Sequence, residues 1–214
     1  MKAESKHIIK LISHYPELDN QIQNIKKAIR LLHDCYKSNT TIYTCGNGGS
    51  ASDAEHIVGE LMKGFALKRE LSLSEVASFE NLYSESGKDI CKNLQQGIPA
   101  ISLVSNAALT TAILNDLDPA YLFAQQVYSL GKKGDVLIAI STSGNSRNVI
   151  NAAKVALAKE ISVVSLTGNS GGELNTHSTI TIKAPSNDVA RIQEYHLPIY
   201  HCICLALEEL CFGD

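Results

Sequence analysis

The sequence predicts an α/β protein with a doubly wound, five-stranded parallel sheet, and three observations lead to this prediction. Segments rich in apolar and β-branched residues alternate with helical patterns, as in successive β-α-β units. Four of the five apolar segments are nearly continuous runs, which is typical of strands that helices cover on both faces. The chain has 214 residues, enough for one α/β domain with a full core and short for two. We therefore expect a single domain over residues 1–214.

The elements of this fold can be placed by their patterns. The expected strands are residues 41–45, 100–104, 136–141, 162–167 and 179–182. The expected helices are residues 50–65, 106–115, 119–130 and 147–159, followed by a long final helix over about 188–210. In sheets of this kind ligands bind beyond the carboxyl ends of the strands, so a site is expected in the loops at that edge.

Residues 1–38 are expected to form a helical arm ahead of the first strand. The helical pattern breaks near Pro16, and proline suits the first turn of a second helix. In that second helix Ile25, Ile29 and Leu32 recur at helical spacing and form an apolar stripe. Such an arm could wrap its own domain or pack on a neighbouring subunit, and we favour the neighbouring subunit.

The segment of residues 67–97 is expected to be an insertion within the domain. It is charged and rich in serine, with short helical patterns near residues 74–81 and 88–96. It could form a lid over the site or a surface excursion, and the excursion is favoured. Its pattern does not suggest a separate domain.

Composition and charge exclude several classes of partner. The formal net charge is -3 and the sequence pI is about 6.2, so neither a nucleic-acid groove nor contact with an anionic membrane surface is expected. No apolar run approaches the ~20 residues of a membrane span, and the N-terminal residues lack an apolar signal core. A cytoplasmic protein is therefore expected. The 6 cysteines have no zinc-finger spacing and are expected to be reduced thiols.

A glycine-rich turn follows the first expected strand. Residues 41–50, TIYTCGNGGS, contain Gly48 and Gly49 in the turn and Ser50 at the start of a helix. This arrangement directs free backbone N–H groups and the positive end of a helix dipole at one point, where a phosphate would bind.

A second loop of this kind follows the expected strand at 136–141, in the sequence VLIAISTSGNS of residues 136–146. Ser146 occupies the position of a helix N-cap. The hydroxyl groups of both loops are those of Ser50, Ser141, Thr142, Ser143 and Ser146. One loop alone could contain only caps and turn formers. Two such loops at strand ends favour a phosphorylated small molecule held between them.

His56 and Glu60 lie four residues apart on the helix that Ser50 begins, so both side chains are on one face. Glu60 is in a mostly apolar stretch, where a carboxylate could act as a general base. The alternative is a solvated glutamate beside a core histidine.

The final helix carries Gln193 and His201 on one side, and Pro198 should bend its axis just before His201. A lone histidine on an apolar helix is more often a core residue than a catalyst. His201 is a candidate only because the chain also contains the two glycine- and serine-rich loops and the His56–Glu60 pair.

These three groups together resemble the sugar isomerase (SIS) domain family. The resemblance rests on residues 45–56 (CGNGGSASDAEH) with Glu60, on residues 140–146 (ISTSGNS), and on residues 191–196 (RIQEYH) with His201. It implies a flavodoxin-like SIS fold. Within the family it points to the branch that converts sedoheptulose 7-phosphate to D-glycero-D-manno-heptose 7-phosphate, an aldose–ketose isomerisation through an enediol.

The resemblance also assigns roles to residues of this chain. Glu60 would be the general base and His201 the general acid. The phosphate would be held by Ser50, Ser141, Thr142, Ser143 and Ser146. The other substrate contacts would come from Asn47, Gly48, Gly49, Asn115, Asp116 and Gln193. Some members bind zinc, and the matching ligands here would be His56, Glu60, Gln193 and His201.

The family is a homotetramer built around its N-terminal helices, with active sites at subunit interfaces, and the same is expected here. One branch, however, keeps the fold and acts as a protein-binding module, and a sugar-phosphate sensor without turnover is a further alternative. The retained Glu60, Gln193 and His201 favour the enzyme. Two departures bear on substrate choice: Gly64 stands where the pattern has an arginine, and the insertion at residues 67–97 is unusually long.

Overall fold

The computed structural model of the chain describes residues 2–213 and contains a five-stranded, all-parallel sheet in the order β2-β1-β3-β4-β5. The strands are β1 (Ile42–Cys45), β2 (Ala100–Ser102), β3 (Val136–Ser141), β4 (Ser162–Thr167) and β5 (Ile180–Lys183). The register aligns Ile42 of β1 with Val136 of β3. The prediction of an α/β protein with a doubly wound parallel sheet is confirmed. Met1 and Asp214, the ends of the expected domain, lie outside the described residues.

Helices flank the sheet and connect its strands. The N-terminal region contains α1 (Lys2–His14), the 3-10 helix η1 (Pro16–Gln21) and α2 (Ile22–Lys37). Between β1 and β3 lie α3 (Gly49–Met62), α4 (Leu73–Tyr83), α5 (Glu85–Asn93), α6 (Ala107–Asp116), η2 (Pro119–Tyr121) and α7 (Leu122–Leu130). The chain continues through α8 (Arg147–Ala158), η3 (Glu173–His177) and α9 (Val189–Phe212). The expected helix at residues 119–130 is divided into η2 and α7.

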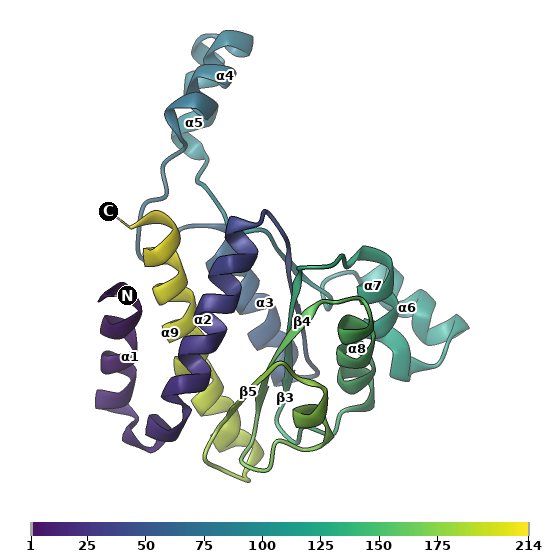
Figure 1. Cartoon of the computed structure of the whole chain (residues 1–214). Helices are drawn as coiled ribbons and strands as arrows, with labels where there is room; N and C mark the ends of the chain where they lie inside the picture. The colour runs from purple at the N-terminus through teal and green to yellow at the C-terminus, as the bar shows by residue number, and fades with distance from the viewer. Residues whose placement is uncertain (1, 214) are drawn as a thin grey trace.

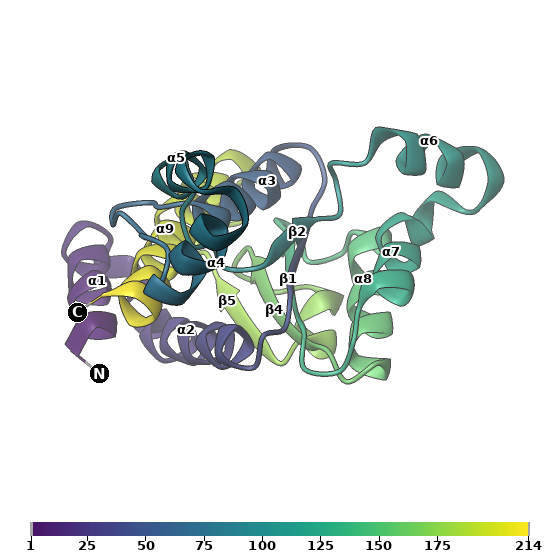
Figure 2. The same ribbon diagram turned by 90° about the horizontal axis from the view of Figure 1, so that it is seen from above.

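The two faces of the sheet are buried under different helices, as Figures 1 and 2 show. Alternate residues of β3 point to opposite sides: Ile138 and Ile140 join the core formed with α2, α3 and α9, whereas Leu137 and Ala139 join the core formed with α7 and α8. This alternation is the pleat of a strand covered on both sides. It explains why β3 is apolar at every position from Val136 to Ile140.

The N-terminal arm packs on its own chain. Ile8 and Leu11 of α1 are buried in the core cluster that contains α9, and Ile25, Ile29 and Leu32 of α2 lie in the same cluster. In Figure 2, α1, α2 and α9 lie together at one end of the molecule, near both termini. A contact between this arm and a neighbouring subunit therefore stays a prediction.

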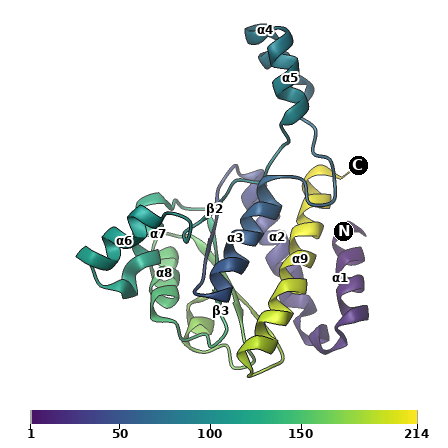
Figure 3. The same ribbon diagram turned by 180° about the vertical axis from the view of Figure 1, so that it is seen from behind.

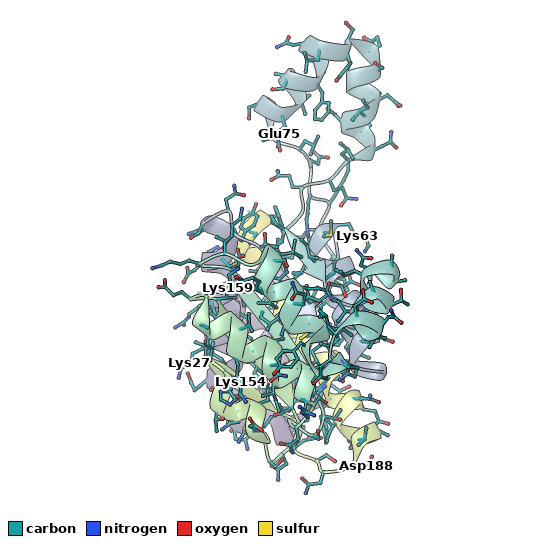
Figure 4. All side chains as sticks on the ribbon, turned by 90° about the vertical axis from the view of Figure 1, so that its right-hand side faces the viewer. Lys27, Lys63, Glu75, Lys154, Lys159 and Asp188 are labelled. Atoms are coloured by element: carbon teal, nitrogen blue, oxygen red, sulfur yellow. The ribbon has the colours of Figure 1, made fainter. Side chains whose placement is uncertain are left out.

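Helices α4 and α5 form a hairpin that projects from the body of the protein (Figures 1 and 3). We call it the hairpin, and the two segments that join it to the body, residues 63–72 and 94–99, the neck. Figure 4 shows Glu75 on the hairpin, clear of the body, and Lys63 where the neck begins. The hairpin leaves the body at the C-terminal end of α3, whereas the loop after β1 lies at its N-terminal end. The interpretation of this segment as a surface excursion and not a lid stays a prediction.

Across residues 2–213, none of the helices combines the length and apolar character that crossing a membrane would require.

Candidate active site

The two glycine- and serine-rich loops lie side by side because they follow neighbouring strands. β1 pairs with β3 in parallel, so the loop after Cys45 and the loop after Ser141 leave the same edge of the sheet. The strand order reverses between β1 and β3, since β2 lies on one side of β1 and the later strands on the other. Such a switch point is where open parallel sheets bind their ligands. The structure thus places the two predicted loops where an anion would be held.

Glycine shapes the first loop. Gly48 has a φ of 56°, a conformation that favours glycine, and it precedes the first residue of α3. At Gly46, a Cβ atom would collide with the backbone carbonyl of Ser50. Ser50 itself is buried, and its N–H bonds the carbonyl of Asn47 at 3.1 Å. The result is a tight turn directed into the N-terminus of α3, where anions are stabilised.

The second loop is held by its own hydroxyl groups and by a packed glycine. The hydroxyls of Ser141 and Ser146 are 3.0 Å apart, and the backbone N–H of Asn145 donates to the Ser143 hydroxyl at 3.1 Å. Gly144 has a φ of 67°, and a Cβ there would collide with the carbonyl of Gly171. Ser143 remains exposed, so its hydroxyl is accessible to a ligand.

Two amide contacts join these loops to the rest of the site. Asn47 and Asn148 exchange two side-chain hydrogen bonds of 2.9 Å and thereby link the first loop to α8. Gln193 of α9 lies against the backbone of Gly49, where even a Cβ atom would overlap its amide nitrogen. A side chain at position 49 would displace the Gln193 amide from this contact. The structure brings together Asn47, Gly48, Gly49, Ser50 and Gln193, and their role in binding a substrate stays a prediction.

The seam between α3 and α9 gathers the predicted acid–base residues. His56 Nε2 is 3.1 Å from Glu60 Oε1, and the ring of His201 meets that of His56 edge-on with centroids 5.0 Å apart. Tyr200 Oη lies 2.9 Å from His56 Nδ1. A neutral His56 that donates from Nε2 to the carboxylate must accept at Nδ1, and the Tyr200 hydroxyl can supply that hydrogen bond. This contact holds the His56–Glu60 pair in place.

Three buried polar atoms where α3 meets α9 have no hydrogen-bond partner among the described residues: Asp53 Oδ2, Glu60 Oε2 and His201 Nε2. The nearest cation to Glu60 Oε2 is Lys63 Nζ at 3.6 Å, and the Glu60 side chain is only 13% exposed. Burial, helped by the neighbouring His56, lowers the pKa of His201 below its usual range. Buried polar atoms are rarely left unpaired, so the free atoms of Glu60 and His201 are candidates for contact with a substrate.

The same residues have the right donors for a metal but are not arranged around one. His56, Glu60 and His201 offer imidazole and carboxylate donors that suit zinc. Within residues 2–213, however, no three His, Cys, Asp or Glu side chains are placed to share one ion. Gln193 lies against Gly49, seven residues or about 10 Å along α3 from His56. The donor set fits zinc in chemistry, and its side chains would have to converge to bind it.

Asn115 and Asp116 lie on α6, away from the candidate residues of α9. They lie exposed at the C-terminal end of α6, where the Asn115 amide donates to Asp116 Oδ1 at 2.8 Å. Figures 2 and 3 show α6 on the opposite side of the molecule from α9.

The structure adds residues that sequence reasoning missed. The Tyr200 hydroxyl lies 2.9 Å from His56 Nδ1 and 3.3 Å from Asp53 Oδ1, and its single proton is donated to one of the two at a time. The ring of Phe65 packs edge-on against His201 at 5.3 Å between centroids. Asp53 could have been found, since it lies three residues before His56 on the same helical face. Phe65 and Asn148 give no such local signal, because their contacts depend on chain reversals.

Known proteins share both this sequence and this fold. The sequence pattern of the SIS domain family matches residues 8–95 and 91–168. The chain belongs to the SIS domain family. A phosphoheptose isomerase of Shewanella denitrificans is 36% identical over 193 residues, which cover 89% of this chain and 85% of that protein. A phosphoheptose isomerase from Shewanella halifaxensis is 37% identical over the same shares of the two chains.

Solved structures of this SIS family resemble the whole chain. The phosphoheptose isomerase of Neisseria gonorrhoeae superposes with a TM-score of 0.73 at 30% identity, covering 96% of both chains. That of Francisella tularensis gives a TM-score of 0.76 at 29% identity, again over 96% of each. The expected SIS fold is confirmed.

Gly64, the departure from the family pattern, is explained by the neck. A Cβ atom at Gly64 would collide with the backbone carbonyl of Leu67 and lie 2.5 Å from Gln95 Oε1. The Gly64 N–H also donates to that same oxygen at 3.0 Å. An arginine at this position would require the neck to open.

Proposed function

We propose that this chain is a sedoheptulose 7-phosphate isomerase that interconverts this ketose and D-glycero-D-manno-heptose 7-phosphate. The observation that carries the proposal is the pair of unpartnered buried atoms, Glu60 Oε2 and His201 Nε2, between α3 and α9. The N-terminal end of α3 lies at the two loops that follow β1 and β3, which have the features of a phosphate site. The names of the related proteins support the choice of substrate. A binding module or sensor would not need an acid–base pair.

The two loops would hold the phosphate through backbone N–H groups and hydroxyls. The contributing side chains would be Ser50, Ser141, Thr142, Ser143 and Ser146, while Asn47 and Gln193 would bind sugar hydroxyls. Ser50 and Glu60 are ten residues apart on α3, about 15 Å along its axis, and helical side chains lean toward the N-terminus. This separation suits a substrate whose phosphate is remote from its reacting carbons, so that phosphate binding positions the sugar.

Glu60 and His201 would carry the proton transfers. Glu60 would remove the proton from C1 of the ketose, next to the carbonyl, while His201 Nε2–H supplies a proton to the carbonyl oxygen at C2, which gives the enediol. Glu60 would then return its proton to C2 while the C1 hydroxyl gives its proton back to His201, which yields the aldose. His201, neutral because of its lowered pKa, would donate a hydrogen bond from Nε2 to the carbonyl oxygen as negative charge develops there. His56 and Tyr200 would keep the Glu60 carboxylate in position.

Zinc is proposed as a cofactor that His56, Glu60, Gln193 and His201 would hold. A zinc ion bound there would polarise the carbonyl and stabilise developing negative charge. Metal content of the purified protein, compared with that of His56→Ala, tests this assignment without an activity assay. Equal and negligible zinc in both proteins would contradict it.

A cytoplasmic homotetramer with sites at its subunit interfaces is proposed for the assembly. The exposed position of Asn115 and Asp116 on α6, away from α9, supports it, because the site of another subunit would give these residues a sugar to bind. Light scattering on the purified protein checks the mass. A monomer that turns over substrate would contradict both the tetramer and this role.

The test of function is incubation of the purified protein with sedoheptulose 7-phosphate, with the aldose product followed by NMR. Product formation is expected. Loss of product formation in the presence of a chelator would indicate that the reaction requires a metal ion. Thermal stabilisation by the sugar phosphate without turnover would instead indicate a sensor or a different substrate.

A further inference from the structure

The C-terminal end of α3, just beyond the proposed base, is held by a buried arginine. Arg69 lies in the neck, and its side chain is 1% exposed. Its Nη2 donates to the carbonyl of Glu60 at 2.9 Å and its Nη1 to the carbonyl of Leu61 at 2.6 Å. The last carbonyls of a helix lack partners within the helix, so Arg69 satisfies two of them. It binds the backbone of the very residue whose side chain is the proposed base.

The third donor of Arg69 reaches α9. Its Nε bonds Glu208 Oε1 at 2.8 Å, and the Glu208 side chain is as deeply buried as the guanidinium. The guanidinium carbon also lies 4.8 Å above the ring of Phe212, in the last turn of α9. Glu208 follows His201 by seven residues, two turns of the same helix. One planar group thus connects the helix of the proposed base to the helix of the proposed acid.

Glu208 in turn holds the residue that packs against His201. Its carboxylate accepts from the backbone N–H groups of Phe65 and Ala66, both at 2.8 Å. The Phe65 ring lies edge-on to His201. Burial alone would raise the pKa of Glu208, but these N–H groups and Arg69 lower it, so the ionised form is the one that the fold holds. The ion pair therefore touches the surroundings of both proposed catalytic side chains.

We propose that Arg69 is a positioning residue for the isomerisation: it fixes the last turn of α3 against α9 and so sets where Glu60 lies relative to His201. The inference rests on the proposed function, since it assumes that Glu60 and His201 act together. A buried ion pair is weak evidence for stability, because hydrophobic residues often stabilise as well. The planar guanidinium of Arg69 donates to two carbonyls at the end of α3 and to the Glu208 carboxylate of α9. This geometry fixes the orientation of α3 relative to α9.

Arg69→Lys is the first test, because it keeps a positive charge and loses the fork. A single ammonium group cannot reach both carbonyls and Glu208 in the same directions. Misplacement by about 1 Å can cost ~10²-fold in rate, so kcat should fall roughly 10- to 100-fold. KM should change less than about twofold, because the phosphate loops lie at the other end of α3. Equal kcat in variant and wild type would overturn the inference.

A second variant separates positioning from folding. Arg69→Met alone leaves a buried charge on Glu208 and could unfold the protein, whereas Arg69→Met with Glu208→Gln removes both charges and keeps an oxygen for the Phe65 and Ala66 N–H groups. The double variant should fold with nearly unchanged Tm and show the same loss of kcat. Faster amide hydrogen exchange in residues 61–66 should accompany it. A loss of activity that is restored on cooling, in step with refolding, would show a structural role and overturn the inference.

Lys68→Met is the matched control, since Lys68 is the neighbouring cation of the neck and its side chain is 75% exposed. It should leave kcat, KM and Tm unchanged. An inactive wild-type protein would overturn the proposed function, and this inference with it. An active wild type with a fully active Arg69→Lys would overturn the inference alone.

Discussion

Two pairs of helices in this protein differ in what holds them together. In the seam, α3 and α9 pack through side chains such as Leu61 and Ile203, which are buried in the core. In the hairpin, α4 and α5 leave Leu73 90% exposed and Leu82 74% exposed, and Gly87 is their one buried residue within the described chain. The seam holds the proposed chemistry because burial fixes side chains to one geometry. The hairpin cannot do so.

Local interactions account for the hairpin helices. Ser72 and Glu75 form a reciprocal capping box at the start of α4. At Gly87, α5 approaches the backbone of Phe79 so closely that a Cβ atom would collide with the Phe79 carbonyl. Lys88 and Glu85 add a surface ion pair. Such contacts shape a short helix, whereas burial supplies most of the stability in the seam.

The largest expected difference between the two regions is catalytic. Glu60→Gln removes the proposed base and should lower kcat by roughly 10²- to 10⁴-fold with a smaller change in KM. Glu80→Gln on the hairpin is the control and should leave both constants unchanged. Steady-state kinetics on sedoheptulose 7-phosphate measure the effect. Similar losses from both variants would remove the distinction between the regions.

Replacing a leucine by alanine should lower the stability of the protein far more in α3 than in the hairpin. Leu61→Ala empties a buried site in the seam and should lower the free energy of unfolding by about 2–5 kcal/mol. Leu82→Ala, on the exposed hairpin, should change it by less than about 0.5 kcal/mol. Urea unfolding followed by circular dichroism measures both. Equal losses of unfolding free energy in Leu61→Ala and Leu82→Ala would contradict this difference between the two regions.

Acid should destabilise the body through a histidine of α9. His196 is fully buried and bonds the carbonyl of Thr167, and burial lowers its pKa to about 4. The unfolded chain takes up this proton near pH 6.5 and the folded one does not, so stability is complete above about pH 6.5 and falls toward pH 4. The loss is of order 3 kcal/mol.

His196→Gln removes this titration and can still donate to Thr167. The slope of unfolding free energy against pH between pH 4 and 6.5 should therefore be shallower in the variant. Glu75→Gln on the hairpin serves as the comparison and should leave the slope nearly unchanged. Parallel pH profiles for His196→Gln and wild type would show that His196 does not control the acid sensitivity.

The smallest expected effect is local to the hairpin. Ser72→Ala breaks the capping box and should favour fraying of α4 by about 0.5–2 kcal/mol. Amide exchange in residues 73–76 should then quicken by roughly 2- to 30-fold while the global Tm stays the same. A lower global Tm would mean that the hairpin and the body unfold as one unit.

Much of the fold could be predicted because it depends on short-range patterns. The strands at residues 136–141 and 162–167 were bounded correctly, since continuous apolar runs mark strands buried on both faces. The two loops that follow β1 and β3 could be paired because parallel strands end at one edge. His56 and Glu60 could be joined by helical spacing alone.

The remaining parts depend on tertiary contacts that no local pattern encodes. Arg69 stands between Lys68 and Glu70 in a charged stretch that looks like surface, and only the fold buries it against Glu208. Asn115 and Asp116 were grouped with the site by resemblance, whereas their position on α6 follows from the path of the whole chain. Charged and amide residues are the least predictable in this respect, because their partners lie far away in sequence.

The neck begins and ends at nearly one point, which makes the hairpin a candidate site for grafting. The Ile98 N–H bonds the carbonyl of Leu61 at 2.9 Å, and Gln96 pairs with the carbonyl of Arg69 at 2.8 Å. A segment whose two ends are already joined can be lengthened at small entropic cost. A reporter domain inserted at the hairpin tip, beside Ser84, would thus be carried away from the sheet without disturbing the strands that build the site.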